Sequence, residues 1–159
     1  MNTLIRLILL AGAVLFSQAS FALYLDAGLG NADVDGTVLG FHIDDSDTYI
    51  KLGVGDKINK NLNWEAGYWD IGTTGKVDGF FGDVKASMPL NSDTELFGKL
   101  GLYVWDGVAP FDGNDLFYGG GVTFKKIGPG NVNLELLLAD LDGFDLMTIG
   151  GSYSIPLNM

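Results

Sequence analysis

Single charged residues interrupt the apolar stretches of this sequence. In LFGKLGLYVWD, residues 96–106, Lys99 stands among aliphatic and aromatic side chains. A lysine buried in this way needs a partner, because removing its charge from water is costly. The residues of this kind are Asp26, Lys51, Glu65, Asp83, Lys85, Lys99 and Glu135. Acids and bases in such similar numbers predict a network of mutually paired charges.

Catalytic chemistry has little support in the sequence. His42 is the only histidine, and it would have to be the base of a surface hydrolase with a dyad or triad. No serine stands in a recognisable nucleophile motif, and the chain has no cysteine. We therefore assign no catalytic residue and no cofactor, and we expect a protein that is not an enzyme.

Aspartates gather between the apolar stretches, and their oxygen atoms could hold Ca²⁺ or Mg²⁺. DGND, residues 112–115, has suitable chemistry but does not match an EF-hand loop. The sequence favours solvated acidic loops that contact the surroundings, and we assign no metal site. The residues concerned are Asp44, Asp45, Asp47, Asp112 and Asp115.

An alternating pattern predicts the elements that carry these residues. In each of eight segments one face is aliphatic, and the other combines glycine with polar, charged or aromatic residues. Such segments, joined alternately by short turns and longer loops, are typical of transmembrane β-barrel strands. The expected strands are residues 23–30, 48–55, 62–71, 79–89, 96–106, 115–124, 131–139 and 146–155.

The N-terminus and the composition restrict the class of protein. Residues 1–22 combine Arg6, an apolar run and small residues before Ala22, which predicts a cleaved signal peptide rather than an uncleaved anchor. The remaining residues 23–159 form one expected domain. A net charge of −11 makes nucleic acid a poor candidate partner.

Two arrangements fit the alternation. In a membrane barrel the aliphatic face meets lipid, whereas in a soluble lipocalin-like barrel it points inward. Glycines such as Gly67 and Gly101 share the charged face, where they give room in a narrow interior, so the membrane barrel is favoured. Its lumen would then be filled by paired charges, or would form a narrow gated pore for small solutes.

Four stretches together resemble the OmpA-like transmembrane domain and related small outer-membrane β-barrel proteins. The likeness keeps strand order across NLNWEAGYWDIG (61–72), VDGFFGDVKASMPLN (77–91), LFGKLGLYVWD (96–106) and DLFYGGGVTF (115–124). It implies an all-β fold, an eight-stranded antiparallel up-and-down transmembrane barrel in the outer membrane of a Gram-negative bacterium. It also implies a lumenal salt-bridge network that includes Glu65, Lys99 and Glu135, and roles in membrane integrity, adhesion or slow passage of small solutes.

The expected partners follow from this interpretation. They are outer-membrane lipid and lipopolysaccharide, the barrel-insertion machinery and an unknown surface ligand, with the barrel itself a monomer. Two features depart from the family pattern. The chain ends SIPLNM rather than on the aromatic residue that the insertion machinery reads, and the seventh strand has no arginine beside Glu135.

Overall fold

The computed structural model describes residues 23–38, 41–72, 77–106, 112–141 and 144–157. The side chains of residues 37–38, 41–44, 112 and 144 lie outside the described part, as do residues 1–22, on which the predicted signal peptide falls. Within the described ranges, no helix is long and apolar enough to cross a membrane.

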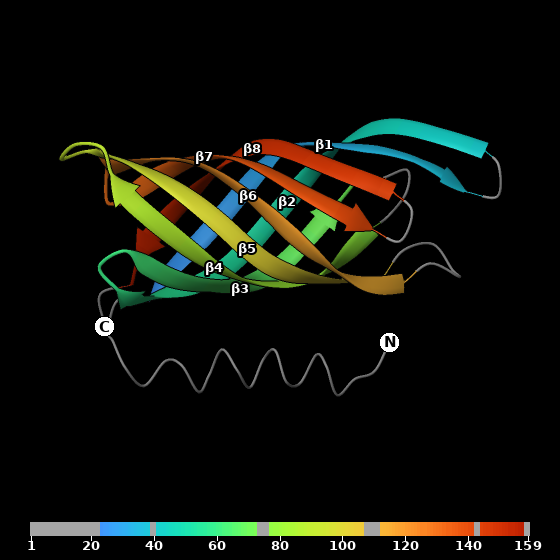
Figure 1. Cartoon of the computed structure of the whole chain (residues 1–159). Coiled ribbons are helices and arrows are strands. Elements are labelled where there is room, and N and C mark those ends of the chain that lie inside the picture. Colours follow the sequence, from blue (N-terminus) through green and yellow to red (C-terminus); the bar gives the residue numbers. More distant parts are fainter. Residues whose placement is uncertain (1–22, 39–40, 73–76, 107–111, 142–143, 158–159) are drawn as a thin grey trace.

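Eight antiparallel strands form a closed barrel in which each strand pairs with its sequence neighbours (Figure 1). The first strand pairs with the last, for example Leu25 with Ile155, and this pairing closes the sheet. The predicted fold class is therefore confirmed. The strands are β1 (Tyr24–Val38), β2 (Phe41–Asn59), β3 (Leu62–Ile71), β4 (Val77–Pro89), β5 (Thr94–Asp106), β6 (Asp112–Ile127), β7 (Gly130–Leu141) and β8 (Phe144–Pro156).

One end of the barrel carries only short turns, which we call the short-turn end. The turns there are residues 60–61, 90–93 and 128–129. A bulge at residues 124–127 precedes the last of them, where Lys126 has a φ of 60°. The short-turn end was correctly predicted, since these turns follow the second, fourth and sixth strands.

The opposite end differs from the sequence prediction. Residues 31–38 and 41–47, which were expected in a loop, belong to β1 and β2, and residues 112–114 belong to β6. The strands β1 and β2 pair as a hairpin that projects beyond the other strands (Figure 1). The hairpin continues through backbone pairing, such as Asp35 with Asp44. Here β1 still alternates, but Ala32 and Val34 take the inward face and aspartates such as Asp35 the outward one. The outward aliphatic face that marks the other strands therefore stops at this point.

The two faces of the sheet are arranged as the alternation predicts for a membrane barrel. Leu29, Leu100 and Leu116 point outward and are 67%, 60% and 64% exposed. Every strand contributes exposed large apolar side chains, which are aliphatic except for aromatic ones such as Tyr68 on β3, and together they form an apolar belt. The soluble barrel with an inward aliphatic face is therefore wrong, and the belt suits the hydrocarbon of a membrane.

Candidate functional site

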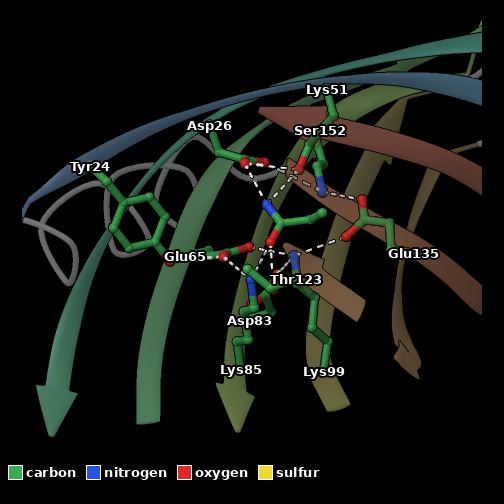
Figure 2. A network of polar contacts seen from close by, with 11 residues as sticks. Tyr24, Asp26, Lys51, Glu65, Asp83, Lys85, Lys99, Thr123, Glu135 and Ser152 are labelled. Carbon is green, nitrogen blue, oxygen red and sulfur yellow. Dashed lines mark hydrogen bonds and ion pairs between the residues drawn. The ribbon is translucent and has the colours of Figure 1, made fainter. Parts of the chain in front are cut away.

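The lumen holds all seven charged residues that the alternation placed there (Figure 2). They come from β1, β2, β3, β4, β5 and β7, and each is at most 7% exposed. Every second residue of a strand faces inward, so the narrow barrel brings side chains that are distant in sequence into contact. The structure thus joins Asp26, Lys51, Glu65, Asp83, Lys85, Lys99 and Glu135 into one group.

Lys99 lies at the centre of this group. Its ammonium group donates a hydrogen bond to Glu65 and lies 3.2 Å from Glu135 Oε2. Asp83 Oδ2 is more distant, at 3.9 Å, and Asp83 Oδ1 has no hydrogen-bond partner in the described part of the chain. Lys99 therefore neutralises mainly Glu65 and Glu135, and Asp83 is held less firmly.

Lys51 forms the second centre of the network. It donates a hydrogen bond to Glu135 and lies 3.6 Å from Asp26 Oδ2. Asp26 also accepts a hydrogen bond of 2.9 Å from the Ser152 hydroxyl. Glu135 is shared by Lys51 and Lys99, so it connects the two halves of the network.

Lys85 is the least enclosed of the three lysines. Its ammonium group donates to Asn133 Oδ1 at 3.1 Å and lies 3.8 Å from Glu65 Oε1. The ring of Phe97 lies 4.2 Å from the same nitrogen, a cation–π distance. Tyr24 donates a 2.8 Å hydrogen bond to Glu65, which therefore has polar partners at both carboxylate oxygens.

Uncharged members of the network were missed from sequence. Thr123 and Asn133 are hydrogen-bonded at 2.7 Å, and Asn133 Nδ2 donates to Ser152 at 3.0 Å. All three residues occupy inward positions, so parity along the strand could have identified them. Charge alone drew attention to the other members.

A second, apolar layer fills the lumen on the side of the long β1–β2 hairpin. Trp69 packs against Tyr49, Tyr103 and Phe117 with ring-centroid distances of 5.8, 5.1 and 5.7 Å. Phe81 completes this group, which we call the aromatic plug. All five side chains are at most 3% exposed. We call the network around Lys51, Lys85 and Lys99, with its hydrogen-bonded Thr123 and Asn133, the charged layer. The sequence showed aromatic residues on the inward face but did not separate them from this layer.

The acidic residues expected in loops have a different setting. Asp45 and Asp47 lie on β2, and Asp115 lies on β6, where it accepts a 2.7 Å hydrogen bond from Trp105 Nε1. The side chains of Asp44 and Asp112 fall outside the described residues, as does that of His42. Among the described residues, no three acidic or histidine side chains are grouped so that they could hold a metal ion.

The closed barrel, the outward apolar belt and the filled lumen define the class of small transmembrane β-barrels. No protein-family model matches the chain, and no curated protein matches its sequence. Solved structures do match. Neisserial surface protein A aligns with a TM-score of 0.65 and 12% identity, covering 87% of this chain and 98% of that one.

Two proteins of Pseudomonas aeruginosa are also similar in structure. The N-terminal β-barrel domain of OprF has a TM-score of 0.59 and 9% identity over 84% of this chain and 98% of that one. The outer membrane protein OprG has a TM-score of 0.52 and 13% identity over 84% and 96%. At these identities the likeness concerns the fold, which is that of the small outer-membrane β-barrel proteins.

Proposed function

We propose that this protein is a structural and surface-contact protein of the outer membrane, with a lumen that is closed to steady solute flow. A cleaved signal peptide at residues 1–22 would direct its export, and the barrel-insertion machinery would place residues 23–159 in the membrane. The barrel would lie in the membrane as a monomer, surrounded by outer-membrane lipid and lipopolysaccharide. The outward aliphatic belt supports this placement.

The observation that carries the proposal is the filling of the lumen by two successive layers. The charged layer has a partner for each of its three lysines. The aromatic plug packs edge to face beside it, as between Trp69 and Phe117. Opening a path would require moving buried rings and separating ion pairs together, and separating a buried pair costs about 3–5 kcal/mol.

Surface contact is supported by the β1–β2 hairpin. It extends past the other strands and carries Asp33, Asp35, Asp45 and Asp47 (Figure 1). Register places Asp35 opposite both Asp44 on β2 and Asp145 on β8. Because this end of the barrel is acidic, it suits contact with cationic groups, or with cations that bridge it to lipopolysaccharide.

Single-channel conductance in planar bilayers tests the closed lumen. The wild-type barrel and a Leu100→Ala control, altered on the lipid face, should give no steady current. The double variant Trp69→Ala/Phe117→Ala, which removes two rings of the plug, should conduct. Steady wild-type conductance that changes in Lys99→Ala would instead establish the narrow small-solute pore and overturn the proposal.

A further inference from the structure

The lumen opens at the short-turn end into a cavity of about 440 Å³, which we call the basic vestibule. A volume of this size is within the range of small-molecule sites. The charged layer forms its floor, because Lys85, Thr123 and Asn133 belong both to that layer and to the cavity wall. The charged residues that line it are Lys57, Lys60, Lys85, Lys125, Lys126 and Glu95.

The charge of the vestibule is opposite to that of the whole protein. Five lysines line it, although the chain has only 9 lysines and arginines in total. One of the 20 acidic residues, Glu95, is on the wall. This concentration of positive charge within a concave site favours an anionic ligand.

The lysines remain available to a ligand to different degrees. Lys60 makes no ion pair within the part of the chain that the structure describes, and Lys125 is bound to Glu95. Lys126 lies 2.8 Å from Asp93, but the two side chains are 72% and 59% exposed, so their attraction is weak. Hydrogen bonds from Lys126 and Ser92 lower the pKa of Asp93, and this carboxylate competes with an anionic ligand for Lys126.

The kind of anion follows from the donors. Lysine offers a point charge with three rotatable donors and is a common phosphate ligand, whereas arginine presents a planar fork that binds carboxylate and phosphate alike. The vestibule has no arginine, and it adds amide and hydroxyl donors from Asn61, Asn131, Ser87 and Ser154. A group with several strong acceptor oxygens and more than one negative charge uses such a wall best.

We propose that the basic vestibule binds a phosphate-bearing anion at the short-turn end of the barrel. Lys60 and Lys126 at the rim attract the phosphate, and Lys85 at the floor marks the limit of its entry. The charged layer and the aromatic plug lie beyond that floor, so the ligand is held rather than conducted. The bound group is either a free phosphate ester or the headgroup of a phospholipid.

Amide NMR titrations of the refolded barrel in neutral detergent test this proposal. The probes are inorganic phosphate, glycerol phosphate and short-chain phosphatidylglycerol, and acetate at equal ionic strength is the carboxylate control. We expect saturable shifts at Lys60, Ser87 and Asn131 with at least one phosphate probe. Binding of glycerol phosphate identifies a free ester as a sufficient ligand, and binding of phosphatidylglycerol alone identifies a headgroup; both results support the site.

Variants at the rim of the vestibule distinguish binding at this site from a general effect of the protein's net charge. Lys60→Gln and Lys126→Gln should each weaken phosphate binding by about tenfold, the loss expected when about 1.4 kcal/mol of attraction is removed. Lys76→Gln, in the connection between β3 and β4, makes the same change of charge and should leave affinity unchanged. Heat-modified gel mobility verifies that each variant is folded. No saturable shift at millimolar phosphate, equal binding of acetate, or equal loss in Lys76→Gln would overturn the proposal.

Discussion

Lys85 and Lys99 occupy directly paired positions on β4 and β5, so two lysines lie side by side on the lumen face. Glu65 and Asp83 are likewise paired on β3 and β4. Like charges in opposed positions destabilise a sheet when they are considered alone. Here Glu65 contacts both lysines, so the arrangement depends on this one carboxylate.

Glu65→Gln should therefore destabilise the barrel strongly. The substitution leaves Lys85 and Lys99 adjacent with less compensation, and breaking a buried pair costs about 3–5 kcal/mol. Asp83→Asn is the matched comparison from the paired position, and it should cost much less because the nearest Asp83 oxygen is 3.9 Å from Lys99. Urea unfolding of the refolded barrels in lipid vesicles measures both. Equal losses for the two variants would contradict the central role of Glu65.

The outward belt gives a second prediction. Leu100 lies in the middle of β5 and is 60% exposed, so Leu100→Lys should place a charge in hydrocarbon and cost about 2–4 kcal/mol. Leu90, in a short turn and 55% exposed, is the control, and Leu90→Lys should cost about 0–1 kcal/mol. The same vesicle unfolding assay compares them. Little change in Leu100→Lys would mean that water, not lipid, covers this face.

Inward glycines allow close approach between the strands. A Cβ at Gly121 would lie 1.9 Å from the Leu134 carbonyl oxygen, so Gly121→Ala requires the backbone to move and should cost about 1–3 kcal/mol. At outward Gly98 the nearest atom to a Cβ would be 3.8 Å away. Gly98→Ala should be neutral or slightly stabilising, and thermal unfolding monitored by gel mobility distinguishes the two. A barrel that accepts Gly121→Ala as readily as Gly98→Ala would refute this close contact.

The orientation of the barrel can be tested with single cysteines, because the chain has none of its own. Asp45→Cys, on the projecting hairpin, should react with a membrane-impermeant maleimide added to intact cells. Lys60→Cys, at the short-turn end, should react only after the outer membrane is permeabilised. The opposite labelling pattern would invert the orientation and expose the basic vestibule to the medium.

Sequence alone predicted the parts of the structure that depend on a period of two. Lys99, Glu65 and Glu135 could be placed on one face because parity along a strand fixes the direction of each side chain. Which acid meets which lysine could not be predicted, since it depends on the stagger between strands. Two registers that differ by two residues would exchange the partners of Lys99 and keep the same faces.

The parts that sequence missed lack an outward aliphatic face or depend on position along the barrel axis. In the β1–β2 hairpin aspartates replace leucines on the outward face of β1, so the segment around Asp35 was expected to be a loop. The aromatic plug and the charged layer share the same inward parity. Only the relative heights of Trp69 and Lys99 in the closed barrel separate them into layers.

Cell fractionation combined with gel mobility tests most directly whether this chain is a closed barrel in the outer membrane. The full chain, expressed in a Gram-negative host, should appear in the outer-membrane fraction. Its band should run at a different position in boiled and unboiled detergent samples, because a folded barrel resists detergent until it is heated. A soluble periplasmic protein with a single band position would contradict both the membrane placement and the lipid-facing belt.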